Sequence, residues 1–154
     1  MPDVEERIKK LGYTLPPPPP PAGNYVPAQR TGNLVFLSGV ISRKIDGSFV
    51  QGKVGRELTV DQGYEAARLC ALNILANLKA AIGDLDKVVC FVKVLGMVNS
   101  DPEFTEVPAV INGCSDLLVE IFGDKGRHAR SAVGLATLPL GVAVEVEAVV
   151  EVEG

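Results

Sequence analysis

An arginine and a glutamate near the C-terminus are the residues best suited to chemistry in this sequence. Arg130 begins the run Arg-Ser-Ala-Val-Gly, and Glu145 lies in the alternating segment 142–152. Arginine offers a rigid fork of donors that matches a carboxylate, and it stays charged when partly buried. A glutamate can orient or deprotonate a water molecule. Together they suit a small substrate that has a carboxylate and a hydrolysable centre, or they form a plain ion pair between subunits.

The other reactive residue types argue against a metal centre. The three cysteines are widely spaced, at Cys70, Cys90 and Cys114, and His128 is the only histidine. Without a CxxC pair or a second histidine, a Cys/His zinc cluster cannot be assembled. We therefore expect no metal and no cofactor, and we expect each cysteine to be a small buried apolar residue.

The charge balance argues against a nucleic-acid partner. There are 15 Lys and Arg against 19 Asp and Glu, the net charge is −4, and no basic run is longer than a pair. Nucleic-acid-binding domains usually present a basic stripe, because neutralising phosphates supplies much of their affinity. The charged N-terminus does not resemble a signal peptide, and no apolar run approaches the roughly 20 residues of a membrane helix. The expectation is a cytoplasmic protein with no membrane partner.

The segment that carries Glu145 is predicted to be a strand. Residues 142–152 alternate valine or alanine with a second set that is mostly glutamate. Because successive side chains of a strand point to opposite faces, the valines form one face that helices should cover. The second face carries the glutamates, which alternation alone would place in solvent.

The preceding strand, 131–137, is expected to form a hairpin with this one through a turn at 138–141. That register places Gly134 opposite Glu145 and puts Arg130 on the same face. Apart from Arg130, the partner strand adds only small side chains to this face, and they cannot shield it. A neighbouring subunit is therefore the simplest candidate to pack on this face, with a cavity between the two subunits. A one-residue slip in the turn would put Arg130 on the opposite face.

The remaining pattern predicts an α+β domain. The order β-β-α-β-α-β-β describes a sheet with two helices, and a capping box of Thr59 with Gln62 marks the start of the first of them. These elements are expected at residues 33–40 and 49–54 (strands), 59–83 (helix), 87–98 (strand), 110–121 (helix), 131–137 and 142–152 (strands).

Residues 1–22 are predicted to be an extension to a domain that spans residues 23–154. Residues 3–11 have the apolar spacing of a short helix. Six consecutive prolines follow, Pro16 to Pro21, and they should form a stiff extended spacer. A ligand for an aromatic groove in a partner domain is the alternative.

Two blocks of this sequence resemble the reactive intermediate deaminase (Rid, YjgF-like) family, which is also known under the label endoribonuclease L-PSP. The C-terminal block comprises Arg130 to Gly134, Leu138-Pro139 and Val144 to Ala148. The N-terminal block comprises Gly23-Asn24-Tyr25 and the run from Gly32 to Gly39. With the order of elements, the resemblance covers roughly residues 23–152.

The resemblance implies a chorismate-mutase-like fold with a mixed sheet and two helices on one face, assembled as a homotrimer with sites at the subunit clefts. By position, Arg130 would hold the substrate carboxylate and Glu145 would position the hydrolytic water. Tyr25, Ser38 and Gly39 would line the pocket. Ala132 stands where many deaminating members have a cysteine, and it would contribute its backbone. Asn112 and Ser115 are both candidates for the asparagine expected on the second helix.

Three functions follow from this resemblance. The first is an enamine/imine deaminase that hydrolyses 2-imino acids of the 2-aminoacrylate type to 2-keto acids and ammonia, without a cofactor. The second is a non-catalytic trimer that binds a small carboxylate or another protein in the same cleft. The third is an endoribonuclease, which has the least support because the sequence lacks a basic groove and a second histidine.

Overall fold

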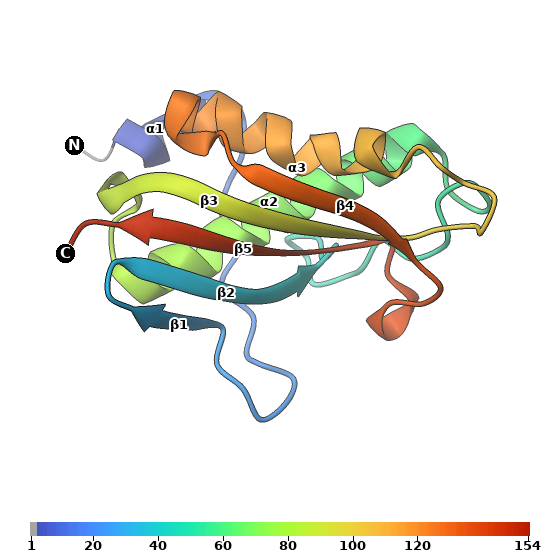
Figure 1. Cartoon of the computed structure of the whole chain (residues 1–154), viewed down its shortest axis with the longest axis horizontal. Helices are drawn as coiled ribbons and strands as arrows, with labels where there is room; N and C mark the ends of the chain where they lie inside the picture. The colour runs from blue at the N-terminus through green and yellow to red at the C-terminus, as the bar shows by residue number, and fades with distance from the viewer. Residues whose placement is uncertain (1–2) are drawn as a thin grey trace.

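The computed structural model describes residues 3–154 and shows one mixed five-stranded sheet covered by helices on one face (Figure 1). This architecture confirms the predicted α+β fold. The strands are ordered β1-β2-β5-β3-β4 across the sheet. Their bounds are β1 Ala28–Thr31, β2 Leu34–Ile41, β3 Val88–Asn99, β4 Ala129–Leu135 and β5 Val144–Val152. The helices are α1 Asp3–Lys10, α2 Val60–Ile82 and α3 Val107–Phe122, with short 3-10 turns at Leu85–Lys87, Gly123–Gly126 and Pro139–Gly141.

Helix α2 begins at the predicted capping box. The Gln62 amide donates to Thr59 Oγ1 at 3.2 Å, and the Thr59 amide donates to Gln62 Oε1 at 2.8 Å. These two bonds satisfy donors that a helix start otherwise leaves unpaired. The helix ends at Gly83, whose φ of 86° favours glycine. Helix α3 packs closely on α2 because Gly113 has no β-carbon, which would overlap the Tyr64 carbonyl.

The alternation predicted for β5 is confirmed. Val144, Val146, Ala148, Val150 and Val152 are buried against the helices, whereas Glu147 is exposed and Glu145 and Val149 are partly buried on the other face. Burial of this apolar face is the main source of stability for a two-layer domain. Among residues 3–154, no helix covers the opposite face of the sheet (Figure 1).

The predicted hairpin between the last two strands is wrong. Strand β4 pairs in parallel with β3, and β3 lies between β4 and β5. Arg130 is therefore opposite Val94, whose side chain is buried under the helices, whereas Glu145 is opposite Met97 on the uncovered face. The two side chains thus leave opposite faces of the sheet within one chain. The turn at 138–141 leads β5 past the end of β3 instead of folding it back on β4.

Two smaller expectations also differ. Residues 49–54 are not a strand, and they form isolated bridges such as Arg43 to Phe49 and Gln51 to Val142. A short strand that the pattern did not reveal, β1, pairs antiparallel with β2 at the far edge of the sheet. Its four residues have little apolar content, so hydrophobic periodicity could not detect it.

The N-terminal segment is packed on the rest of the chain. Val4 and Ile8 of α1 are buried, and the Asp86 carboxylate accepts bonds from the amides of Asp3 and Val4 at 2.9 Å. Leu15 packs against the core before the prolines begin. The boundary placed between residues 22 and 23 stays a prediction. Among the residues described, no helix is both long and apolar enough to cross a membrane.

Candidate functional site

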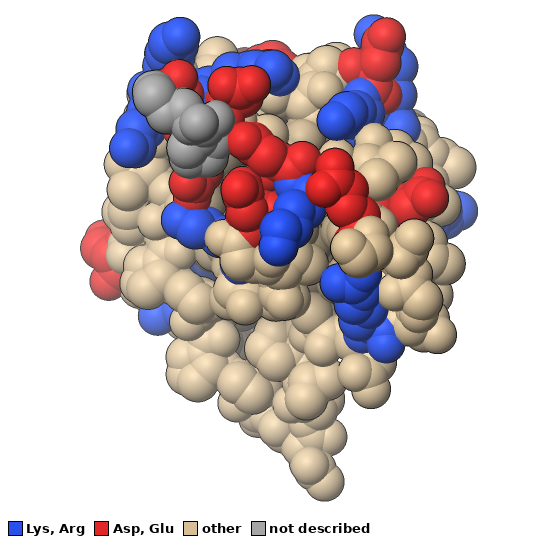
Figure 2. All heavy atoms as spheres, turned by 90° about the vertical axis from the view of Figure 1, so that its left-hand side faces the viewer, with Lys and Arg blue, Asp and Glu red and all other residues tan. Residues whose placement is uncertain are grey.

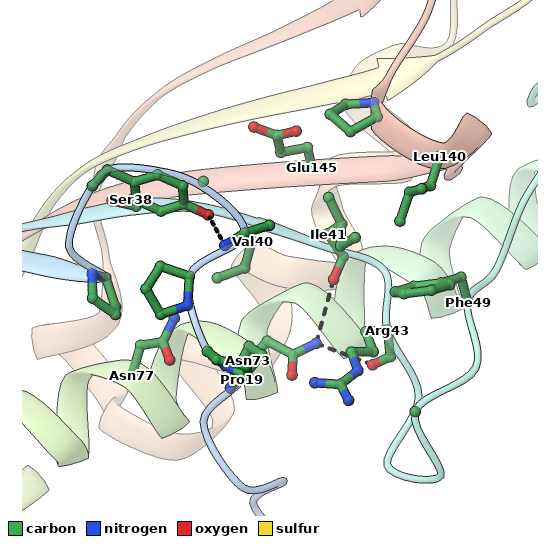
Figure 3. Close-up of a pocket in the computed structure, with 18 residues that line it drawn as sticks. Pro19, Ser38, Val40, Ile41, Arg43, Phe49, Asn73, Asn77, Leu140 and Glu145 are labelled. Carbon is green, nitrogen blue, oxygen red and sulfur yellow. Dashed lines mark hydrogen bonds between the residues drawn. The ribbon is translucent and has the colours of Figure 1, made fainter.

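A pocket of about 850 Å³ lies where the proline segment passes the ends of β2 and α2 (Figure 3). Four of the residues expected at the site line it, namely Tyr25, Ser38, Gly39 and Glu145. They come from the loop before β1, from β2 and from β5, so chain segments more than 100 residues apart converge there. Apolar side chains make up most of the remaining wall, including several prolines, Ile41, Phe49 and Leu140.

Glu145 lies beside a β-bulge in β2. The pairing of β2 with β5 shifts between Leu37 and Val40, so Ser38 and Gly39 form a bulge. The Glu145 carboxylate lies against Gly39, where a β-carbon would overlap it. The absence of a side chain at Gly39 therefore leaves room for the carboxylate in this position. The φ of Gly39 lies outside the left-handed region, so its backbone does not require glycine.

The environment of Glu145 favours its protonated form. Burial raises the pKa of this carboxyl group, and the neighbouring charge of Glu147 raises it further. No salt bridge to Glu145 is found within residues 3–154. A carboxylate with a raised pKa is a stronger base toward a water molecule than an ordinary exposed carboxylate.

Ser38 and Tyr25 fix the loop that forms the mouth of the pocket. The Ser38 hydroxyl donates to the Val26 carbonyl at 2.6 Å, and the Ser38 amide donates to the Pro27 carbonyl at 2.9 Å. The Tyr25 ring is half exposed, and its hydroxyl accepts a long bond from the Ala22 amide. Ser38 therefore holds the backbone, whereas the Tyr25 ring is free to contact a ligand.

Arg130 lies outside this pocket and is held by helix α3. Its Nη1 donates to Asn112 Oδ1 at 2.8 Å and to Ser115 Oγ at 3.2 Å. Both candidates for the expected helix asparagine thus contact the arginine. Ala132 points to the same side of β4 and packs against the core. Arg130 and Ala132 are therefore not brought together with Glu145 in one chain.

His128 completes the support of Arg130. Its Nε2 is 2.9 Å from Ser115 Oγ, and its Nδ1 is 2.7 Å from the Gly126 carbonyl. Only a ring protonated at Nδ1 can donate to that carbonyl and still accept from Ser115. Burial lowers the pKa of His128, and the nearby positive charge of Arg130 lowers it further, which matches the neutral ring. The chain of bonds Arg130–Ser115–His128 therefore orients the guanidinium.

The sequence pattern missed three polar residues of the pocket. Asn73, Asn77 and Arg43 all line it, and Asn73 Nδ2 donates to the carbonyls of Ile41 and Arg43. Both asparagines lie on the buried face of α2, which the apolar periodicity alone would fill with hydrophobic residues. An asparagine inside an apolar stripe is the signal that could have identified them.

Other reactive groups lie away from the pocket. Cys70 and Cys114 are buried as expected, whereas Cys90 is only partly buried. Burial raises the pKa of Cys70 well above its usual range and that of Cys114 to about 12. Within residues 3–154, no three His, Cys, Asp or Glu side chains are placed to hold a metal ion. On the face shown in Figure 2, basic and acidic side chains are interspersed and form no continuous basic patch.

Comparison with known proteins places these features in a family. A family model described as "YjgF/chorismate_mutase-like, putative endoribonuclease" matches residues 5–152. Protein TCP17 of Trypanosoma cruzi is 46% identical over 149 residues, which are 96% of this chain and 93% of that protein.

Two solved structures have closely similar folds. A protein of unknown function from Agrobacterium tumefaciens has 46% identity and a TM-score of 0.91, covering 98% of this chain and 94% of that one. A Shewanella oneidensis protein described as a "putative endoribonuclease" has 35% identity and a TM-score of 0.94, covering 97% of this chain and 99% of that one. The similarity therefore includes the N-terminal helix and the proline segment.

Proposed function

The chain belongs to the Rid/YjgF family, and from that premise we propose that it is an enamine/imine deaminase that converts 2-imino acids to 2-keto acids and ammonia. The observation that carries the proposal is the half-buried Glu145 carboxylate, which faces an open pocket, has a raised pKa and lacks a salt-bridge partner among residues 3–154. Such a group is free to act on water.

Hydrolysis of the imine needs one side chain that moves protons between the water molecule and the nitrogen. The enamine first tautomerises to the imine. Glu145 then takes a proton from a water molecule as the water oxygen bonds to the imine carbon, and it passes that proton to the imine nitrogen. In the resulting tetrahedral intermediate, the hydroxyl proton moves to the nitrogen through Glu145, the C–N bond breaks, ammonia leaves and the keto group forms. The protein places the acid and the water, which can account for a large part of such a rate enhancement.

Arg130 would bind the substrate carboxylate from a neighbouring subunit. Within one chain it leaves the opposite face of the sheet from Glu145, so a shared site requires a second copy. In the described part of the chain, no helix covers the face that carries Glu145, and Phe36 and Val133 are exposed on it. An uncovered apolar sheet face of this kind is suited to self-association. We propose a homotrimer in which this face is covered.

A turnover assay tests the proposal. An amino-acid oxidase would generate 2-imino acids in situ, and the release of keto acid and ammonia would be followed with and without the protein. Wild-type chain should accelerate release, whereas Arg130→Ala and Glu145→Gln should each reduce the acceleration by roughly 10²-fold or more. Arg127→Ala removes an exposed arginine three residues away and serves as the control. Acceleration that survives both site variants would contradict the proposal.

The wild-type chain and the same variants also distinguish the two other candidate functions from this one. A non-catalytic carboxylate-binding trimer would bind keto acids through Arg130 and show no turnover. RNA cleavage by a histidine pair is not favoured, because His128 is the only histidine and both of its ring nitrogens are already within hydrogen-bonding distance of Ser115 and Gly126. The structure thus gives the endoribonuclease function no additional support.

A further inference from the structure

The guanidinium of Arg130 has one side engaged by helix α3 and another side without a partner. Its Nη1 donates to Asn112 Oδ1 at 2.8 Å and to Ser115 Oγ at 3.2 Å. Within residues 3–154, Nε and Nη2 of Arg130 form no hydrogen bond, and the residue forms no salt bridge. A guanidinium presents its donors in a flat fork, so Nε and Nη2 together form an edge that matches the two oxygens of a carboxylate. The edge that contains Nη1 is already engaged.

Ser115 can hold Nη1 because its own hydrogen is directed elsewhere. A serine hydroxyl has a single hydrogen and two lone pairs, and it rotates to suit its partners. His128 Nε2 lies 2.9 Å from Ser115 Oγ, and it carries no hydrogen in the neutral ring that donates from Nδ1. The Ser115 hydroxyl therefore donates to His128, which leaves its lone pairs for Arg130.

The ring of His128 is itself fixed to helix α3. Its Nδ1 donates to the Gly126 carbonyl at 2.7 Å. Gly126 ends the turn Gly123–Gly126 and packs directly on the helix, since a β-carbon there would lie 2.3 Å from the Leu118 carbonyl oxygen. The ring thus bridges from this turn to Ser115 on the same helix. A rigid support therefore fixes one end of the chain of hydrogen bonds, and the guanidinium lies at the other end.

We propose that His128 is a positioning residue for the substrate carboxylate. Acting through Ser115, it holds the Nη1 side of Arg130 on α3 and leaves the edge formed by Nε and Nη2 to bind both carboxylate oxygens side-on. The inference rests on the proposed function for the identity of the ligand, a 2-imino or 2-keto acid. His128 does not touch the substrate in this arrangement and moves no proton.

Two substitutions of His128 separate positioning from a structural link between the turn and the helix. An asparagine amide reaches about as far as Nδ1, so His128→Asn keeps a donor for Gly126 and removes the acceptor for Ser115. A glutamine amide reaches about as far as Nε2, so His128→Gln keeps the acceptor for Ser115 and removes the donor for Gly126. Each variant loses one hydrogen bond, and a merely structural role would make their effects equal.

Binding of 2-oxobutanoate, a stable 2-keto acid, to the full chain would be measured by calorimetry. His128→Asn should raise Kd by roughly three- to ten-fold, because Ser115 can then turn its hydrogen toward Arg130. His128→Gln should have a clearly smaller effect. Equal effects of the two variants, or a larger effect of His128→Gln, overturn the inference, as does wild-type protein that does not bind 2-oxobutanoate.

Ser115→Ala removes the hydroxyl through which His128 is proposed to act. Alone, it should raise Kd about as much as His128→Asn does. The double variant should bind no more weakly than Ser115→Ala, because both changes interrupt the same chain of hydrogen bonds. Factors that multiply would show that His128 affects binding by another route and would overturn the inference.

The edge of Arg130 that binds the ligand is tested on the wild-type chain by NMR. The Nε–H resonance of Arg130, identified by its absence from the spectrum of Arg130→Lys, should shift when 2-oxobutanoate is added, because side-on binding gives Nε–H a carboxylate acceptor. An unchanged resonance at saturating ligand overturns the inference, and this measurement decides if His128→Asn does not fold. Because no turnover is measured, a chain that binds the keto acid in this way but hydrolyses no imine would reject the proposed reaction and retain the carboxylate site.

Discussion

The carboxylate of Glu145 lies in the space beside Gly39 that a β-carbon at position 39 would fill. The bulge at Ser38 and Gly39 in β2 creates this space, and the neighbouring strand β5 supplies the carboxylate. The position of the proposed proton acceptor thus depends on a residue that has no side chain.

Gly39→Ala should therefore impair the site with little effect on the fold. The added methyl group would push the Glu145 carboxylate out of place, and misplacing a reacting group by about 1 Å can cost on the order of 10²-fold in rate. Turnover of imines should fall by about that factor, with the melting temperature nearly unchanged. Full activity in Gly39→Ala would show that the carboxylate does not need its present position.

Glu145→Gln should be more stable than wild type at neutral pH. Burial raises the pKa of Glu145 above its ordinary 4.5, so the folded chain binds this proton more tightly than the unfolded chain does. The stabilising contribution of the protonated group is present below pH 4.5 and is lost as the pH rises through the raised pKa. Glutamine carries no charge, so the variant does not bury an ionised group at neutral pH. We expect its free energy of unfolding to exceed that of the wild type by about 0.5 kcal/mol.

Denaturant unfolding at several pH values measures this difference. The advantage of Glu145→Gln over wild type should be largest at neutral pH and should shrink as the pH falls through the raised pKa. Glu147→Gln, a change at an exposed position of the same strand, is the comparison. A variant less stable than wild type at neutral pH would show that the carboxylate is stabilised by an interaction not seen here.

Asn112→Ala should weaken substrate binding more than turnover. Arg130 would lose its 2.8 Å bond to Asn112 and keep the 3.2 Å bond to Ser115. A less well oriented guanidinium should raise KM by roughly three- to ten-fold and leave kcat nearly unchanged. Asn112→Asp retains the acceptor and should restore KM. An effect on kcat alone would count against a positioning role for Asn112.

Local signals in the sequence predicted the elements that they describe. The reciprocal capping of Thr59 and Gln62 marked the start of α2, and the alternation of β5 identified its buried face. Both patterns depend on neighbours within a few residues. Glu145 was identified by its residue type and strand position, whereas Tyr25, Ser38 and Gly39 came from the family resemblance. The structure places the four residues around one pocket.

The pairing of the strands could not be predicted from such local signals. A short turn between two strands favours a hairpin, but here β3 pairs with both β4 and β5 and separates them. The side-chain alternation of Arg130 fits either arrangement, because alternation fixes a face only once the partner is known. The proline segment was expected to be a spacer, since nothing in six prolines indicates that they form a pocket wall.

The central claim is that each site combines Glu145 of one subunit with Arg130 of another. Arg130→Ala and Glu145→Gln chains, each inactive alone, would be unfolded together in equal amounts, refolded and assayed for imine hydrolysis. Random mixing gives a subunit pair with both native residues at about a quarter of the sites, so activity should return to about a quarter of wild type. Mixtures as inactive as the separate variants, with trimer formation confirmed, would contradict the shared site.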